Sequence, residues 1–384
     1  MLAPTPYFAD RGCHVRIYEE AKILQETGCD VRIVTYHIGR DMPGITTERI
    51  SSLPWYQKMT AGPSWQKPLL DILLFLKAAS IALDFRPQII HAHLHEGAFI
   101  GMLLRPLLRA PLIMDFQGSL TMECLDHNFF SKDSIACKIF SFIERIINRS
   151  ADALITSSTA GANQLRSSWN VPDRKLFPVI DGVDTTRFFP RPDNEVRKKY
   201  GILQGKPLVV FLGVLNEYQG VDLLLQAALI MKERMIDVHF LLMGYPDSAY
   251  RSMAAEMGLA DMITFTGRID YDQAASFLSA GDLAVSPKLS RTEANGKILN
   301  YMACALPTVV FDTEANRELL GDTGVYAAYG SAADLAQKIM ELLAEPERLK
   351  MLSGIVLEKA EREHSWAARG ALIKNVYKQL LDIK

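Results

Sequence analysis

The sequence lacks an excess of charge of either sign. Its 384 residues include 42 Lys and Arg and 44 Asp and Glu, which gives a formal net charge of −2 at pH 7. A chain this close to neutral is not a general binder of nucleic acid or other polyanions. Any phosphate chemistry must therefore depend on a few well-placed cations.

Cysteine is also scarce. The five cysteines are odd in number and scattered, without the paired spacing of a zinc site or a disulfide framework. We expect buried free thiols, a reducing compartment, and no bound metal or cofactor.

Two kinds of apolar segment are missing. No basic N-terminal stretch leads into an apolar run, the pattern that marks a signal peptide. The longest apolar stretch, from Leu69 to Phe85, is interrupted by Asp71, Lys77 and Asp84, and it falls short of the ~20 residues of a membrane-spanning helix. We therefore expect a soluble, cytoplasmic protein, for which a peripheral contact with the inner face of the membrane stays open.

Short apolar runs alternate with longer stretches of helical period along the chain. This alternation predicts parallel sheets covered on both faces, in an α/β fold of two tandem Rossmann-like, doubly wound domains. The predicted strands are residues 1–4, 30–35, 88–92, 111–115, 153–156 and 176–180, then 207–213, 238–244, 262–266, 283–286, 308–311 and 324–327. The predicted helices are 14–27, 69–85, 95–108, 134–149 and 159–169, then 222–232, 248–257, 271–280, 296–303, 315–320, 332–343 and 365–381.

A linker signal follows the sixth predicted strand. Asp-Gly-Val-Asp from residue 181 is followed by two prolines and a charged stretch. The sequence thus predicts an N-terminal domain at 1–182, a linker at 183–204, a C-terminal domain at 205–364, and a final helix at 365–384 that packs back on the first domain. Such sheets bind ligands beyond the carboxyl ends of their strands, so we expect the site in the cleft between the domains.

No Walker-type or GxGxxG motif is present, which argues against a P-loop enzyme and a dinucleotide dehydrogenase. The loop from Pro4 to His14 instead follows a strand, contains Gly12 and opens a helix, whose N-terminal amides are suited to a phosphate. A glycine required only by the geometry of the turn is the alternative.

Three histidines, His91, His93 and His95, lie at the end of a predicted strand. Alternation would place them on one side, as in a metal cluster, but no thiol or carboxylate trio accompanies them. We favour polar histidines that line a cleft. Asp115 ends the next strand at the same edge, where it either lies in the site or caps the following loop.

Residues 286–307 hold the most candidates for donor binding. A polar loop follows a strand there, and Gly296 leads into a helix whose first turn contains Lys297. A lysine is unfavourable at that end of the helix dipole, so a nearby anion would explain it; a solvated polar loop is the alternative. The other candidates for contacts with a diphosphate or with sugar hydroxyls are Lys288, Arg291, Glu293, Asn295 and Asn300.

Residues 54–67 mix aromatic and basic side chains, with Trp55 and Trp65 close to Lys58 and Lys67. This mixture is typical of interfacial segments and would suit a lipid-linked acceptor. A surface loop whose aromatic rings pack on the domain is the alternative.

Six segments, in order along the chain, carry a resemblance to a known family. They read PQIIHAH, ADALITSS, FPVIDGVDTTRFFP, VVFLGVLNEYQGVDLLLQA, ITFTGRI and EANGKILNYMACALPTVV. Over nearly its whole length the chain resembles glycosyltransferase family 4, the retaining nucleotide-sugar transferases of the two-Rossmann-domain GT-B architecture. DGVDTTRFFP is a variant of that family's NGVD-x3-F-x-P signature.

The resemblance implies roles for several residues. It places Gly12 where the family's glycine-rich loop approaches the donor diphosphate, and Gln117 where many members have a histidine near the reacting sugar. It places Arg268 and Ile269 in the loop whose backbone holds the nucleobase.

The chain also departs from the family pattern. Glu293 lies one residue from the first of the family's two glutamates, and Asn300 replaces the second, which normally binds ribose. The loop from Val214 to Gly220 lacks the usual arginine and lysine. We expect the basic residues of 288–297 to supply the missing charge, because a diphosphate without a cation is costly to desolvate; lost transfer activity is the alternative.

The sequence thus predicts a retaining, metal-independent glycosyltransferase of cell-surface polysaccharide or glycolipid synthesis. The second domain would bind a nucleoside diphosphate sugar, and the first a carbohydrate or lipid-linked acceptor, with no nucleic acid involved. An epimerase of the same architecture and a non-catalytic subunit are the alternatives. The predicted site residues are Glu293, Gln117 and His93 for catalysis; Gly12, Arg268, Ile269, Lys288, Asn295, Gly296, Lys297 and Asn300 for the donor; and His95, Asp115 and Trp55 for the acceptor.

Overall fold

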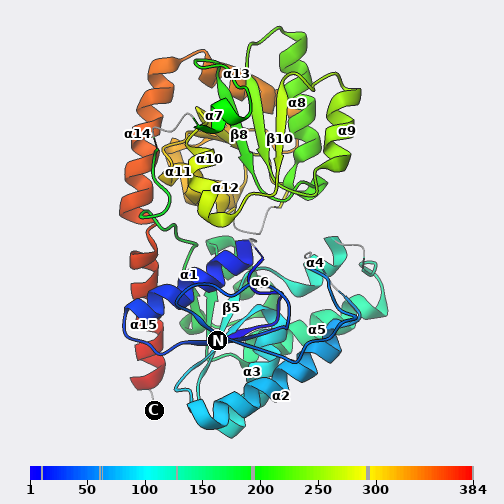
Figure 1. Cartoon of the computed structure of the whole chain (residues 1–384). Helices are drawn as coiled ribbons and strands as arrows, with labels where there is room; N and C mark the ends of the chain where they lie inside the picture. Colours follow the sequence, from blue (N-terminus) through cyan, green and yellow to red (C-terminus); the bar gives the residue numbers. More distant parts are fainter. Residues whose placement is uncertain are drawn as a thin grey trace. The chain divides into compact units, whose positions relative to one another are not determined.

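The computed structural model describes residues 1–9, 12–59, 62, 64–126, 129–191, 195–290 and 295–382. The chain divides into two compact units. The first contains the described residues up to Asp181 and the C-terminal helix from Trp366, and the second contains those between Gly182 and Ser365. Each unit is a Rossmann-like α/β domain (Figure 1), as the sequence predicts.

The first unit is built on a seven-stranded sheet in the order β3-β2-β1-β4-β5-β6-β7, in which every neighbouring pair is parallel. Its inner strands are apolar and buried because helices cover both faces. The strands are β1 (Leu2–Ala3), β2 (Arg32–Thr35), β3 (Thr46–Arg49), β4 (Ile90–His93), β5 (Leu112–Phe116), β6 (Ala153–Thr156) and β7 (Leu176–Pro178).

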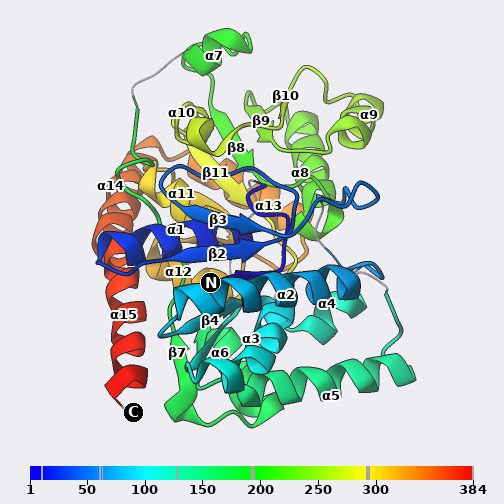
Figure 2. The ribbon, with the colours of Figure 1, turned by 60° about the horizontal axis from the view of Figure 1, so that its bottom comes forward.

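Two groups of helices cover this sheet. On one side, α1 packs against the C-terminal helix α15; a Cβ at Gly370 would lie 2.3 Å from Cγ1 of Ile23, so a glycine is needed there. On the other side, α3 contacts both α2 and α5, as Figure 2 shows. The helices are α1 (Gly12–Glu26), α2 (Lys67–Phe85), α3 (Leu94–Leu108), α4 (Leu120–Asp126), α5 (Ile135–Ser150), α6 (Thr159–Trp169) and α15 (Trp366–Asp382), with a 3₁₀ turn η1 (Asp173–Lys175).

The second unit contains a six-stranded parallel sheet in the order β10-β9-β8-β11-β12-β13. Its strands are β8 (Leu208–Leu212), β9 (His239–Met243), β10 (Ile263–Gly267), β11 (Leu283–Ser286), β12 (Thr308–Phe311) and β13 (Val325–Ala327). Its helices are α7 (Glu195–Lys199), α8 (Val221–Glu233), α9 (Ser248–Glu256), α10 (Ala274–Leu278), α11 (Lys297–Ala303), α12 (Glu314–Leu320), α13 (Ala332–Leu343) and α14 (Pro346–Glu363), with 3₁₀ turns η2 (Glu217–Gln219), η3 (Tyr271–Gln273) and η4 (Gly321–Thr323).

One strand and three α-helices of the structure were not predicted from the sequence. For two of them the physical reason is clear. β3 reads Thr-Thr-Glu-Arg and has no buried residue, because it is an edge strand without an apolar face. α14 buries only Leu352, Val356 and Ala360, a stripe too narrow to stand out among its charged residues. The other two are the short helices α4 and α7. None of the helices in the described ranges has the length and apolar character needed to cross a bilayer.

Candidate functional site

In the second sheet, the order in which successive strands are added reverses at one place, between β8 and β11. β8 and β11 are neighbours, and from them the connections lead outward in opposite directions, to β9 and to β12. The loops beyond the carboxyl ends of such a strand pair leave a crevice in which α/β proteins bind ligands. The described parts of these loops are residues 213–220 after β8, and residues 287–290 and 295–296 between β11 and α11.

Lys297 spans this crevice. It is the first residue of α11, and its ammonium group donates a hydrogen bond of 2.6 Å to Oε1 of Gln219 in the opposite loop. The ammonium lies 4.5 Å from the ring centre of Phe211, near the end of β8. As a whole residue, Lys297 is half-buried.

The charge of Lys297 is poorly compensated. Burial, and to a smaller extent repulsion from Lys288, holds the pKa of Lys297 well below its ordinary value. In the part of the chain that the structure describes, no carboxylate pairs with this ammonium, and its bonded partner is the neutral amide of Gln219. Lys288 is itself buried, 5.6 Å from the ring centre of Tyr218. An anion bound at Lys297 would offset this repulsion.

Two glycines, Gly213 and Gly244, allow the backbone to pack closely at this place: Gly213 approaches Lys297, and Gly244 approaches Gly213. A Cβ at Gly213 would lie 2.8 Å from Nζ of Lys297, and one at Gly244 would lie 1.8 Å from the carbonyl oxygen of Gly213. The amide of Gly213 donates to Met243 at 2.9 Å. The loops after β8 and β9 therefore pack against each other in a way that side chains would prevent.

The remaining predicted donor residues have different surroundings. Asn295 is buried, and its amide bonds Ser286 and Asn316 at 3.0 Å each. This side chain therefore ties β11 to α12, and its amide hydrogens are both used within the protein. Gly296 is the N-cap of α11, and Asn300 is partly exposed on the same helix.

Arg268 and Ile269 directly follow β10. Arg268 is exposed, and its guanidinium lies 5.6 Å from the ring centre of Tyr245, in the loop after β9. Glu293 and Arg291 lie outside the described residues. The predicted donor roles of all these residues remain predictions.

In the first unit, three predicted residues meet at the carboxyl ends of β4 and β5. His93 and Asp115 are paired in the sheet register, and Nδ1 of His93 donates to Oδ2 of Asp115 at 3.0 Å. Nε2 of Gln117 donates to the same oxygen at 2.7 Å. His93 and Asp115 are fully buried, whereas Gln117 is partly exposed.

A buried arginine that the sequence analysis missed organises this group. Arg16 on α1 forms ion pairs with Asp115 at 2.8 Å, Glu20 at 2.9 Å and Asp181 at 2.6 Å. Burial alone would raise the pKa of Asp115, but Arg16 and then His93 outweigh it and hold that pKa well below its usual range. Arg16 and Glu20 are four residues apart, a helical ion-pair spacing that the sequence does display.

The expectation that three histidines share one side is wrong. His91 and His93 stack with ring centres 4.7 Å apart, but β4 ends at His93 and His95 belongs to α3. His95 contacts Phe116, on the sheet face opposite Asp115, and lies 3.4 Å from Glu144 of α5. The change from strand to helix breaks the alternation on which the expectation depended.

His91 and His93 could hold a metal together with Glu20, because ligand atoms of the three lie within 4.8 Å of one another. Arg16 lies 2.9 Å from the Glu20 carboxylate, so a metal would meet a like charge beside it. His91 also bonds the hydroxyl of Tyr377 on α15, 2.7 Å from its Nδ1. We assign no metal to this group.

Gly12 and Trp55 also belong to the first unit. Gly12 begins α1 as an exposed residue, in agreement with the predicted turn from loop to helix. Trp55 is half exposed and has an edge contact with Tyr56.

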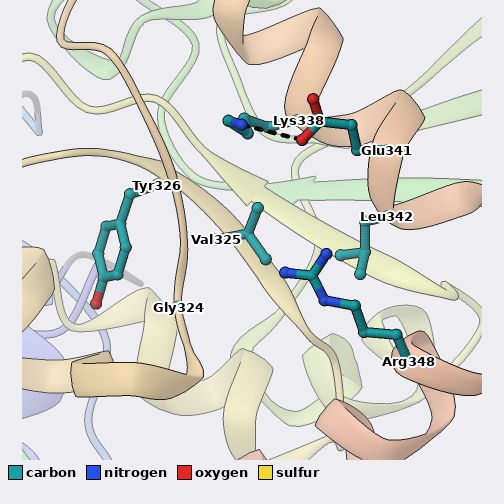
Figure 3. A pocket seen from close by; sticks show the side chains of 7 residues that line it. All are labelled: Gly324, Val325, Tyr326, Lys338, Glu341, Leu342 and Arg348. Carbon is teal, nitrogen blue, oxygen red and sulfur yellow. Dashed lines mark hydrogen bonds and ion pairs between the residues drawn. The ribbon is translucent and has the colours of Figure 1, made fainter. Parts of the chain in front are cut away.

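The hollow drawn in Figure 3 is another concave surface of the second unit, and its lining differs from that of the crevice at Lys297. It measures about 200 Å³, and it is lined by Gly324–Tyr326 at the start of β13 together with residues of α13 and α14. Lys338 and Glu341 pair there at 2.9 Å. It adjoins the amino end of its strand and offers no uncompensated cation, so it does not match the expected donor site.

Comparison with known families fits this geometry. A family model described as "Glycosyl transferase 4-like domain" matches residues 11–180, and one described as "Glycosyl transferases group 1" matches residues 206–345. Together they span most of the chain. The chain therefore belongs to these glycosyl transferases, and with its two Rossmann-like units it is a glycosyltransferase of the GT-B type.

Particular relatives are more distant. D-inositol 3-phosphate glycosyltransferase of Thermobispora bispora is 25% identical over 97% of this chain and 90% of its own length. Sucrose-phosphate synthase from Thermosynechococcus elongatus superposes with a TM-score of 0.83 at 19% identity, over 100% of this chain and 96% of its own. Anabaena HepE, solved in complex with UDP-glucose, superposes with a TM-score of 0.78 at 16% identity, over 98% of both chains. The two structural likenesses show the fold alone.

Proposed function

We propose that this protein transfers a sugar from a nucleoside diphosphate sugar to an acceptor hydroxyl, with retention at the anomeric carbon. The supporting observation is the ammonium of Lys297, which lies in the crevice between β8 and β11 with a neutral amide as its bonded partner. A donor diphosphate would supply the missing negative charge. That HepE was solved with UDP-glucose is consistent with this class of donor.

In this proposal the cations act on the leaving group. When the bond between the anomeric carbon and the diphosphate oxygen breaks, negative charge grows on the departing diphosphate. Lys297, with Lys288 close by, would stabilise that charge in place of a metal ion. The acceptor oxygen bonds to the anomeric carbon, its proton passes to the departing diphosphate oxygen, and the nucleoside diphosphate leaves.

The other roles follow the sequence predictions. In the second unit, Arg268 and Ile269 would contact the nucleobase and Asn300 the ribose. Glu293 would orient the sugar, and Gly12 would approach the diphosphate.

In the first unit, Gln117 would contact the sugar near its reacting face. In place of the catalytic role predicted for His93 and the acceptor role predicted for Asp115, these two buried residues would hold the amide of Gln117 in position. Trp55 and His95 would belong to the acceptor side. We further propose a carbohydrate or lipid-linked acceptor in polysaccharide or glycolipid synthesis, reached from the cytoplasm.

Binding is tested first, with a panel of nucleoside diphosphate sugars measured by thermal shift and calorimetry, in EDTA and then with Mg²⁺. At least one donor should raise the melting temperature in EDTA, and Lys297→Met should remove the shift. Lys338→Met, which changes a partly exposed lysine of the same unit that pairs with Glu341, is the matched control. Donor binding that survives in Lys297→Met, or that requires Mg²⁺, would refute the assigned charge contact.

Product analysis then tests the reaction. Incubation of the bound donor with and without an acceptor extract should give a glycosylated product only when acceptor is present, with the anomeric configuration of the donor. Conversion of the donor to an epimer without acceptor, or inversion in the product, would contradict the proposal.

A further inference from the structure

Helix α5 is amphipathic, but it leaves most of its large apolar side chains exposed. Its buried residues are Cys137 and Ile147 together with two polar ones, Glu144 and Asn148. Its exposed residues include five large apolar side chains, of which Ile135 is 77% and Phe142 64% exposed. A surface helix normally packs its apolar stripe on the core, so this orientation requires a reason.

The contacts of Glu144 fix the orientation. Its Oε2 accepts hydrogen bonds from the backbone amide of Thr121 at 2.9 Å, the hydroxyl of Thr121 at 2.6 Å and the hydroxyl of Ser119 at 3.1 Å. These contacts hold the loop between β5 and α4. If α5 turned its apolar side inward, the carboxylate would lose three donors, which is costly for a buried charge.

The adjoining helices extend the apolar surface. α3 contacts both α2 and α5, and the three helices lie in the same layer (Figure 2). α2 and α3 also expose large apolar side chains. We refer to the exposed faces of α2, α3 and α5 together as the apolar face. Its large exposed side chains are Leu69, Ile72, Leu76, Leu83, Phe99, Leu103, Leu107, Ile135, Ile139, Phe142, Ile143 and Ile146. A surface of this extent on an isolated protein marks a contact with something else.

The charges on α5 select the partner. The exposed charged side chains of this helix are Lys138, Arg145 and Arg149, and its one acidic residue, Glu144, is buried. A second copy that docked α5 against α5 would bring these like charges together. An anionic lipid surface would instead accept the apolar side chains and pair with the cations.

We propose that the apolar face docks on the surface of an anionic lipid bilayer, with Ile139 and Phe142 of α5 inserted at the level of the headgroups. The inference does not depend on the assigned donor chemistry, because vesicle binding and nucleotide binding are separate measurements.

The test is flotation of the full chain with vesicles of phosphatidylcholine, with and without about one third phosphatidylglycerol. The protein should float with anionic vesicles at low salt and float less at high salt, since exposed charge pairing is screened. Ile139→Ser with Phe142→Ser should lower the partition coefficient at least about tenfold. A triple change of Lys138, Arg145 and Arg149 to Gln should do the same, because each basic residue near such a surface contributes about fivefold.

The matched control is Leu203→Ser with Met351→Ser. Both residues are large, apolar and more than half exposed, and both belong to the second unit. All variants change exposed side chains, and their thermal unfolding should match the wild type. Equal flotation of control and wild type is part of the expected result.

Two results would overturn the inference. One is the absence of flotation with anionic vesicles at low salt. The other is a wild-type dimer in light scattering without lipid that Ile139→Ser with Phe142→Ser converts to a monomer, since the apolar face would then bind a second copy.

Discussion

Replacing Lys297 by methionine should stabilise the unliganded protein and at the same time weaken nucleotide binding. Methionine keeps most of the length and apolar surface of the lysine, and it can pack on Phe211 as the lysine stem does. The change removes a charge that burial disfavours and that no described carboxylate compensates. A residue placed there only for stability would give the opposite result.

Two opposing contributions to the free energy of unfolding set the size of the stabilisation expected for Lys297→Met. The 2.6 Å hydrogen bond to Gln219 is worth about 1 kcal/mol. Desolvation of an ammonium costs several kcal/mol when burial is complete, and we take about 2 kcal/mol because the residue as a whole is half-buried. The net gain of about 1 kcal/mol corresponds to roughly 2–4 °C in the melting temperature of a unit of this size. Loss of a charged contact to a diphosphate should weaken binding by about 3 kcal/mol, which is about a hundredfold in Kd.

The pH dependence gives an independent check on the cause. Since the pKa of Lys297 is lowered in the folded state, this group binds more protons in the unfolded chain, and its destabilising contribution decreases as the pH rises toward about pH 10. The advantage of Lys297→Met should therefore shrink as the pH is raised. The assay is thermal unfolding across pH together with calorimetric titration of the nucleotide, with Lys338→Met as control. A variant that melts below the wild type and still binds nucleotide normally would refute the reasoning.

Three further predictions concern the two sheet edges. Asp115→Asn should destabilise the first unit by about 3–5 kcal/mol, because it breaks a buried ion pair; urea unfolding measures this loss, and Asp312→Asn, in an exposed pair, should change stability by less than about 1 kcal/mol. Burial raises the pKa of Glu20, so its contribution to stability is complete below about pH 4 and is lost as the pH rises. The melting temperature of Glu20→Gln relative to wild type should therefore increase from about pH 5 to pH 8, and a constant difference would count against this shift. Gly244→Ala should weaken nucleotide binding at least about tenfold, because its Cβ would lie 1.8 Å from the carbonyl oxygen of Gly213; unchanged affinity by calorimetry would show that the backbone adjusts.

Most of the fold could be predicted from the sequence because inner strands of a parallel sheet are continuous apolar runs. Twelve of the thirteen strands are apolar enough to be found, whereas β3 depends on its neighbour β2 for pairing. The same reasoning predicted helix α1 but did not find its buried charged residues. α1 buries Arg16 and Glu20, and a pattern that assumes charged residues face solvent cannot find them. The i, i+4 spacing of the pair was visible, but not that Asp115 and Asp181, distant in sequence, complete its charge balance.

In the candidate site, too, features that depend on neighbouring residues could be predicted, whereas contacts between residues far apart in the sequence could not. That Lys297 begins a helix after β11 could be read from the sequence. Its contact with Gln219, 78 residues away, depends on β8 and β11 being neighbours, which follows from the topology of the whole sheet. The histidines mark the reverse case, where local alternation was extended across the point at which β4 becomes α3.

The two units treat a buried cation at the sheet edge in opposite ways, and this difference supports the assignment of ligands. Arg16 has three carboxylates within 3 Å, so an anion that approached it would meet charge already balanced or in excess. Lys297 has an amide, so an anion that approached it would relieve an existing cost. In a chain whose net charge is only −2, attraction of a diphosphate cannot come from the overall field and must come from such a local imbalance. The donor is therefore expected in the second unit, and the first unit is suited to an acceptor that reacts through a neutral hydroxyl.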